Sequence, residues 1–179
     1  YDSKTSDIAV GCYHLQLPQT YATFEEASAA AAQYSDGFPA WIDGTYYVRV
    51  GSFLDSTSAQ AAQASLGLTG ATVAGTSGAG ISVVKTGTNT VLFQFDSTSG
   101  LYLAVKPGRD DTVKAETYFR GYSYFGAFEY RRNGGDITVV NVLSMDDYLQ
   151  GVIVQEMSPS WPLEALKAQT VCARSYAYG

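Results

Sequence analysis

Hydrophobic and polar positions in the first 85 residues switch between a two-residue period and a three-to-four-residue period. Runs rich in valine, isoleucine and aromatic residues predict strands at 8–15, 38–42, 45–53 and 80–87. Alanine-rich runs predict helices at 24–34 and 56–67. This order of strands and helices favours a four-stranded antiparallel sheet with both helices on one face, the ferredoxin-like arrangement of an α+β protein.

Local capping and turn signals support these boundaries. Thr23 is the expected N-cap of the first helix, and either Ser56 or Ser58 is the expected N-cap of the second. Gly67 is the expected stop of the second helix, because glycine readily adopts the left-handed conformation that ends helices. Asp43-Gly44 separates two of the strands and is typical of a tight β-hairpin.

Residues 86–143 continue with alternating patterns that predict further antiparallel strands. These runs are VLFQFD, LYLAVK, AETYF, SYFGAFEYRR and ITVVNVL, and the turns between them include STSG and Asn133-Gly134-Gly135. We expect this block to join the C-terminal part of the chain. The sequence therefore predicts two domains, at 1–85 and 86–179.

The pattern becomes helical from Ser144 to the end of the chain. One face of the first helix collects the apolar residues Met145, Tyr148, Leu149, Val152, Ile153 and Met157. Ser144 is its expected N-cap, and Pro159 prevents its continuation. A second helix is expected to begin with Ser160 as N-cap and Pro162 in its first turn. Glu164, also in the first turn, is expected either to interact with the helix dipole or to cap a backbone amide.

Composition narrows the classes of function. The chain has 179 residues and a net charge of −6, which disfavours a nucleic-acid partner because phosphate binding needs a basic surface. There is no run of about 18 apolar residues that could span a membrane. Few charges and 14 tyrosines suit a β-rich exported protein. A single histidine and two distant cysteines give no zinc signature, and we expect no metal or cofactor.

The two cysteines leave one question open. Cys12 and Cys172 can form a disulfide only if the fold brings their Cα atoms within about 7 Å. Cys172 lies in an apolar helical run, so a buried free thiol is the expected state of this residue.

The segment YLQGVIVQEMSPSWPLEALKAQTVCARSYAYG, residues 148–179, carries the chemistry of the chain. It resembles the SpoIID/LytB family, whose pattern contains Glu-Met, then Trp-Pro-x-Glu-Ala-Leu-Lys-Ala-Gln, then Ala-Arg-Ser-Tyr-Ala. One departure is Glu-Met-Ser-Pro, in which the proline stands one position later than in the family. Upstream, Tyr118-Phe119-Arg120-Gly121 is similar to a Tyr-Arg-Gly element of the same domain, so the resemblance covers about 118–179.

This resemblance implies an activity on peptidoglycan. SpoIID-type members are lytic transglycosylases that cut the MurNAc–GlcNAc β-1,4 bond, leave a 1,6-anhydro end and prefer strands without stem peptides. LytB-type members are described as amidase enhancers. By position, Glu156 is the catalytic acid, and Lys167 and Arg174 match positions linked to activity. Family members extend beyond residue 179, so we expect the rest of the groove to lie outside this chain and leave open whether the chain alone turns over substrate.

Physical reasoning gives the same residues definite roles. Cleavage of a glycosidic bond needs a proton on the leaving oxygen, and an apolar wall of Val154, Met157 and Trp161 would favour a protonated Glu156. Lys167 or Arg174 is expected to bind the lactyl carboxylate of the substrate. Further substrate-binding candidates are Gln169, Trp161 and Tyr148. Gln169 either orients Glu156 or bonds locally, and Trp161 either stacks on a sugar or packs in the core.

The N-terminal part has a second resemblance. The strand YYVRVGSF at 46–53, followed by a small-residue helix, resembles the SPOR domain, a peptidoglycan-binding module, over about 7–85. Both resemblances imply glycan strands as partner and a location outside the cytoplasmic membrane, secreted or anchored in the cell wall, including the forespore-engulfment space. Three hypotheses stay open: a glycan-cleaving enzyme, a non-catalytic helper of a cell-wall amidase, and a purely structural wall-binding module.

Overall fold

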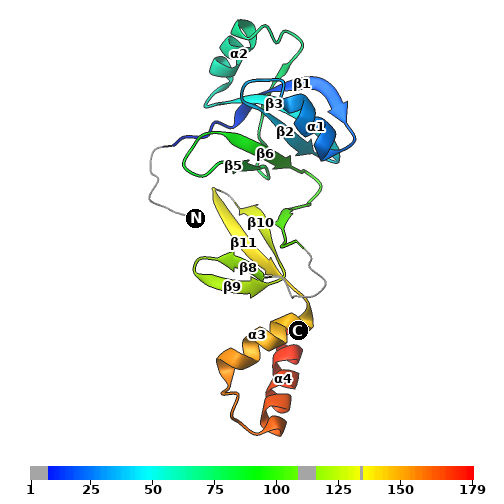
Figure 1. Ribbon diagram of the computed structural model, residues 1–179, viewed down its shortest axis with the longest axis vertical. Coiled ribbons are helices and arrows are strands. Elements are labelled where there is room, and N and C mark those ends of the chain that lie inside the picture. Colours follow the sequence, from blue (N-terminus) through cyan, green and yellow to red (C-terminus); the bar gives the residue numbers. More distant parts are fainter. Residues whose placement is uncertain (1–7, 109–115, 134) are drawn as a thin grey trace. The chain divides into compact units, whose positions relative to one another are not determined.

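The computed structural model describes residues 8–108, 116–133 and 135–179. Within these residues the chain forms eleven strands and four helices, an α+β architecture (Figure 1). It divides into two compact units. Unit 1 comprises Tyr1–Leu103 and Tyr130–Thr138, and unit 2 comprises Ala104–Glu129 and Val139–Gly179.

Unit 1 is built on a six-stranded sheet in the order β4-β1-β3-β2-β6-β5. Its elements are β1 (Tyr13–Tyr21), α1 (Phe24–Ala31), β2 (Gly37–Ile42), β3 (Thr45–Phe53), α2 (Ser56–Ser65), β4 (Thr72–Gly75), β5 (Ile81–Val84) and β6 (Val91–Asp96). The first six follow the predicted order of strands and helices, although β1 begins later than the predicted strand at 8–15 and α1 ends earlier than the predicted helix at 24–34.

The last predicted strand of this part, at 80–87, does form as β5, but its predicted place in the sheet is wrong. The strand that pairs with β1 is β4, at Thr72–Gly75, whereas β5 at Ile81–Val84 lies at the opposite edge and pairs with β6. The expectation that β6 joins the C-terminal part is also wrong, because β6 pairs in parallel with β2. Pairing between strands that are far apart in sequence is not encoded in the local pattern, which explains both errors.

Capping positions follow simple physical rules. Thr23 caps α1 as predicted, in a capping box in which its side chain accepts from Glu26 and the Glu26 carboxylate accepts from the Thr23 amide. The cap of α2 is Asp55 rather than Ser56 or Ser58, since the Asp55 carboxylate accepts from the Ser58 amide at 2.7 Å. Gly67 has a φ of 67° directly after α2, as expected for a stop signal.

The predicted hairpin between β2 and β3 is confirmed. Asp43 and Gly44 have φ values of 43° and 95°, the left-handed conformation that a two-residue turn requires. The Asp43 carboxylate also accepts hydrogen bonds from the amide and hydroxyl of Thr98, which follows β6, and these bonds lower the Asp43 pKa. The turn is therefore tied to the end of β6.

One face of the sheet packs against both helices. Leu15 and Leu17 of β1 and Val48 and Val50 of β3 form this apolar core. The helices contribute small side chains, Ala31 from α1 and Ala59 from α2, both of which are buried. Small side chains let the helices approach the sheet closely, which explains why both helices are formed by alanine-rich segments.

The other face of the sheet is strongly concave. Six strands at about 4.8 Å spacing would hold the edges of a flat sheet about 24 Å apart. Yet the edge strands β4 and β5 are joined by residues 76–80 alone, which span at most about 20 Å. A hydrogen bond across the concave face confirms the curl, since Gln94 of β6 donates to the hydroxyl of Thr76, beside β4, at 2.8 Å.

This concave face encloses a buried polar network. Arg49 donates twice to the side-chain oxygen Oε1 of Gln16, at 3.1 and 2.8 Å, and once to Oε1 of Gln94. His14 donates from Nδ1 to the Gly51 carbonyl at 2.8 Å, which leaves Nε2 to accept from Gln94 at 3.1 Å. Burial lowers the pKa of His14 from 6.5 to about 4, and burial lowers the pKa of Arg49 to about 10.

Unit 2 combines short strands with two helices (Figure 1). Strands β8 (Glu116–Phe119) and β9 (Tyr122–Phe125) form a separate hairpin. Strands β7 (Leu103–Val105), β10 (Ala127–Asn133) and β11 (Asp136–Val142) form a sheet in the order β11-β10-β7, although part of each of these strands is counted in unit 1. The predicted turn at Asn133-Gly134-Gly135 includes Gly134, which lies outside the described residues. None of the helices in the described ranges is long and apolar enough to cross a membrane.

Candidate active site

The first helix of the candidate site, α3 (Met145–Glu156), forms as the sequence predicts. Ser144 is its N-cap, and the Ser144 hydroxyl accepts from the Asp147 amide at 3.2 Å. Its apolar face is turned inward, with Leu149 buried and Tyr148, Val152 and Ile153 half-buried. Glu156 is the last residue of α3, and the chain turns extended at Met157.

The second helix, α4 (Leu163–Tyr178), begins differently from the prediction. Pro162 occupies the N-cap position and no side chain caps the helix, so the prediction of Ser160 as N-cap is wrong. Ser160 instead bonds to Ser158 through both its hydroxyl and its amide, within the turn between the helices. Glu164 lies in the first turn of α4, as the dipole alternative requires, and its carboxylate forms an ion pair with Lys167 at 2.8 Å instead of capping an amide.

The two helices bring Glu156 and Gln169 together. The Gln169 amide on α4 donates a hydrogen bond to the Glu156 carboxylate at the end of α3. Gln169 is half-buried, whereas Glu156 is exposed. Of the two roles that the sequence leaves open for Gln169, the structure shows the one in which it holds the Glu156 side chain.

The structure pairs the two predicted cations with carboxylates. Lys167 bonds to Glu164 on its own helix, and Arg174 reaches Asp146 in the first turn of α3 at 3.6 Å. All four side chains are well exposed, so these pairs contribute little to stability. A substrate carboxylate would have to compete with Glu164 or Asp146 for these cations.

The side chains predicted to form an apolar wall around Glu156 do not bury it. Val154 is 59% exposed and Trp161 is 54% exposed, while Met157 is half-buried. Glu156 therefore faces open surface rather than an apolar recess. Tyr148 is half-buried on α3, and Trp161 stays free for stacking because it lies largely outside the core.

The expectation of a buried Cys172 is wrong. Both Cys172 and Cys12 are free and exposed. Cys172 is exposed because it lies on the outer side of α4. Of the two residues adjacent to it in sequence, Ala173 is buried and Val171 is exposed. In the described part of the chain, no three side chains of His, Cys, Asp or Glu gather in an arrangement that could hold a metal ion.

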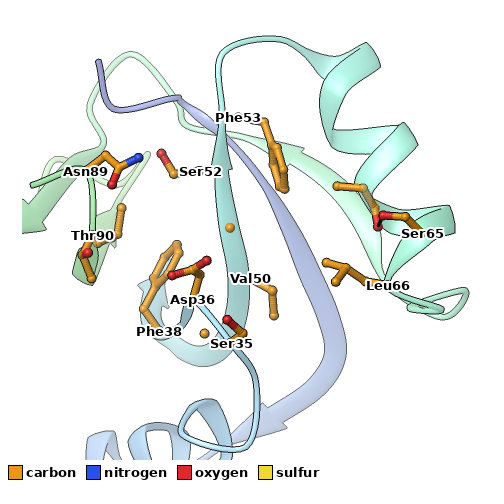
Figure 2. Close-up of a pocket in the computed structure, with 14 residues that line it drawn as sticks. Ser35, Asp36, Phe38, Val50, Ser52, Phe53, Ser65, Leu66, Asn89 and Thr90 are labelled. Carbon is orange, nitrogen blue, oxygen red and sulfur yellow. Dashed lines mark hydrogen bonds between the residues drawn. The ribbon is translucent and has the colours of Figure 1, made fainter. Parts of the chain in front are cut away.

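A cleft in unit 1 was not predicted from the sequence (Figure 2). Its volume is about 480 Å³, within the range of small-ligand sites. Figure 2 shows Asn89 and Thr90 on one side of β3, and Ser65 at the end of α2 with the following Leu66 on the other. No local motif marks it, because its walls come from four separate segments of the chain.

The lining of this cleft combines an apolar floor with a polar rim. Phe38, Val50 and Val91 are buried, and the Phe53 ring lies over Gly51, where a Cβ atom would stand 2.5 Å from the ring. The rim carries hydroxyl, amide and carboxylate groups, from Ser35, Asp36, Ser52, Ser65, Asn89 and Thr90. Such a surface suits a neutral ligand with both apolar and hydroxylated faces.

Comparison with known proteins gives a family match for the C-terminal segment. A family model described as SpoIID, stage II sporulation protein, matches residues 133–179. An uncharacterized protein of Brachyspira hyodysenteriae is 49% identical over 57 residues, which make up 32% of this chain and only 16% of the relative. No solved structure matches the chain. The segment that carries α3, α4 and Glu156 therefore lies within the part of the chain that matches the SpoIID family model.

Proposed function

We propose that the segment around α3 and α4 belongs to a peptidoglycan lytic transglycosylase, with Glu156 as its catalytic acid. The observation that carries this proposal is the hydrogen bond from Gln169 to Glu156 inside the segment that the SpoIID model matches. A carboxyl group with a fixed orientation and an open approach suits a substrate that is a polymer. The exposure of Glu156 and Trp161 leaves such an approach.

The proposed reaction needs one carboxyl group and no water. Glu156 gives its proton to the glycosidic oxygen, so that the bond between MurNAc C1 and the GlcNAc O4 oxygen breaks. The MurNAc C6 hydroxyl then attacks C1 and closes the 1,6-anhydro ring. The proton of that hydroxyl returns to the Glu156 carboxylate, which restores the acid and balances the reaction.

The second candidate function is a non-catalytic helper of a cell-wall amidase. It is favoured by the incomplete apolar wall at Glu156 and by the ion pairs that already occupy Lys167 and Arg174. In this role the hairpin of α3 and α4 binds glycan without cutting it, and the amidase acts on the presented strand.

For unit 1 we propose a glycan-binding role in the cell wall, outside the cytoplasmic membrane. Its first four strands and two helices have the ferredoxin-like order, with the sheet order β4-β1-β3-β2 extended by β6 and β5. This order and the strand YYVRVGSF support a SPOR-like module. The cleft of Figure 2, with its apolar floor and hydroxylated rim, is the candidate place for a sugar.

The activity is tested by incubating the chain with peptide-free glycan strands and analysing the products by mass spectrometry. We expect 1,6-anhydro ends with the wild type and none with Glu156→Gln. Glu164→Gln is the matched control, because Glu164 is also an exposed glutamate of the same hairpin and has no proposed role in the chemistry. Anhydro ends that persist in Glu156→Gln would contradict the proposal. Absence of cleavage, together with faster digestion of intact peptidoglycan by an added amidase, would establish the helper function instead.

A further inference from the structure

The tip of the β8–β9 hairpin holds an arginine in an unfavourable backbone conformation. Phe119 and Tyr122 face each other across the turn, and Arg120 and Gly121 between them have φ values of 50° and 92°. Asparagine, aspartate or glycine normally occupies the first of these two positions, since other side chains clash with the backbone there. The other described residues with positive φ, glycines apart, are Asp36 and Asp43, which tolerate it.

This choice of residue points to a role for the guanidinium group. A turn selected only for folding would carry Asn-Gly or Asp-Gly, and arginine destabilises it by roughly 1 kcal/mol. Arg120 is exposed and makes no hydrogen bond or ion pair with any described residue. In this respect it differs from Lys167 and Arg174, which are paired with Glu164 and Asp146.

An exposed aromatic side chain lies beside this turn. Tyr118 is 74% exposed, and its hydroxyl reaches the turn, 3.9 Å from the position that a Cβ atom on Gly121 would take. Tyr122 is 69% exposed but belongs to the other face of the hairpin, because it pairs with Phe119 while Tyr118 pairs with Ser123. The exposed surface of Tyr118 and the free charge of Arg120 therefore lie together at the tip.

The hairpin that presents this pair is anchored by aromatic packing. Phe119 and Tyr124 both contact the buried ring of Phe128 on β10, with ring centroids 5.2 and 5.5 Å apart. The Thr117 hydroxyl also donates to the Gly126 carbonyl at 3.3 Å. Such anchoring reduces the entropy that the tip loses when it binds a ligand.

We propose that Tyr118 and Arg120 form a binding site for an acidic sugar of the glycan strand. The Tyr118 ring stacks on a sugar face, and the Arg120 guanidinium binds the carboxylate of the lactyl group. This inference rests on the proposed function and assigns the recognition of the substrate's carboxylate to the tip rather than to Lys167 or Arg174. It makes the tip a specificity determinant that separates peptidoglycan glycan from uncharged glycans.

The test measures binding of the whole chain to two oligosaccharides of equal length. One is a peptide-free GlcNAc–MurNAc oligomer, and the other is a chitin oligomer, which lacks the lactyl carboxylate. We expect the wild type to bind the first about tenfold more tightly and Arg120→Asn to lose this preference. Arg120→Asn also relieves the backbone strain, so thermal unfolding should show an equally or more stable protein.

The aromatic contact has its own matched pair of variants. Tyr118→Ala should weaken binding of both oligomers, whereas Tyr122→Ala, on the opposite face with similar exposure, should leave both affinities unchanged. The inference is overturned if Arg120→Asn keeps the wild-type preference, if Tyr122→Ala weakens binding as much as Tyr118→Ala, or if the wild type binds neither oligomer. Glycan cleavage is scored separately with Glu156→Gln. If Arg120→Asn loses the preference and the wild type shows no cleavage, the binding site at the tip is supported and the proposed enzyme activity is refuted. If the wild type cleaves glycan and Arg120→Asn keeps the preference, the enzyme activity is supported and the binding site is refuted.

Discussion

The Gln169 amide donates its hydrogen bond to Glu156 from a position thirteen residues later, across the turn between α3 and α4. This contact fixes the direction of the carboxylate, and orientation of a reacting group is a large part of catalysis. We expect Gln169→Leu to lower the rate of glycan cleavage about tenfold with little change in KM. The measurement is kcat and KM for anhydro-end formation as a function of pH.

Gln155 provides the control for this prediction. It is exposed and precedes Glu156 on α3, but Gln169 does not contact it. Gln155→Leu should leave both kinetic constants and the pH profile unchanged. If Gln169→Leu only lowers the melting temperature and leaves the pH profile of kcat intact, its role is structural and the prediction is wrong.

His14 makes the stability of unit 1 depend on pH. Its pKa is lowered from 6.5 to about 4, so the unfolded chain binds a proton more readily than the folded chain does. The stability that neutral His14 provides is complete above pH 6.5 and is lost as the pH falls toward 4. Since each tenfold change in proton affinity equals about 1.4 kcal/mol, we expect the unfolding free energy to fall by about 3 kcal/mol between pH 7 and 4.

Urea denaturation at several pH values checks this dependence. The assignment is clean because the chain has a single histidine. Asp43 and Asp55, whose pKa values are lowered from 3.8 by hydrogen bonds to Thr98 and Ser58, lose their contributions only at lower pH. His14→Gln should flatten the profile between pH 4 and 6.5, and a slope that survives in this variant would rule out His14 as its source.

Arg49 should be a sensitive position in the same network. Arg49→Ala removes the donor to the Oε1 atoms of Gln16 and Gln94, and leaves the buried Oε1 of Gln94 without this partner. We expect a loss of unfolding free energy of at least about 3 kcal/mol, measured by urea denaturation. Lys85→Ala is the exposed control and should change stability by less than about 0.5 kcal/mol. Equal effects of the two variants would show that the network is not a determinant of stability.

Gly126 joins β9 to β10 in a conformation that only glycine fits easily. Its φ is 83°, and an added Cβ atom would stand 2.3 Å from the Val142 carbonyl oxygen. Gly126→Ala should therefore destabilise unit 2 by about 2 kcal/mol or more. Gly135→Ala is the control, because no atom of a described residue lies within 4 Å of its added Cβ. The measurement is the melting temperature of both variants by thermal unfolding. We expect the lower value for Gly126→Ala, and similar melting temperatures would contradict the prediction.

Local features of the chain were predictable from the sequence where neighbours in sequence decide them. Thr23 and Ser144 cap their helices, and Asp43-Gly44 turns its hairpin, since each interaction lies within three residues. Even here a competing side chain can prevail. Asp55 caps α2 instead of Ser56 or Ser58, because its carboxylate reaches both the amide and the hydroxyl of Ser58.

Long-range pairing and burial could not be predicted in the same way. Arg49 and Gln94 occupy alternating polar positions that indicate a solvent-facing side of a strand, yet the curl of the sheet buries both. At the candidate site, the sequence named Glu156 and Gln169 and the structure brings them into contact. The sequence also predicted Lys167 and Arg174 as site residues, but it did not predict their ion pairs. Lys167 pairs with Glu164 on its own helix, and Arg174 pairs with Asp146 on the neighbouring helix.

The parallel pairing of β6 with β2 determines how short a functional piece of unit 1 can be. A polypeptide that stops at residue 85 would lack Gln94, so Arg49 and His14 would each lose a partner, and the outer side of β2 would be open to any extended chain. Such a piece would be prone to self-association. Expression of unit 1 by itself should therefore extend at least to Thr98, whose bonds to Asp43 fasten the final strand.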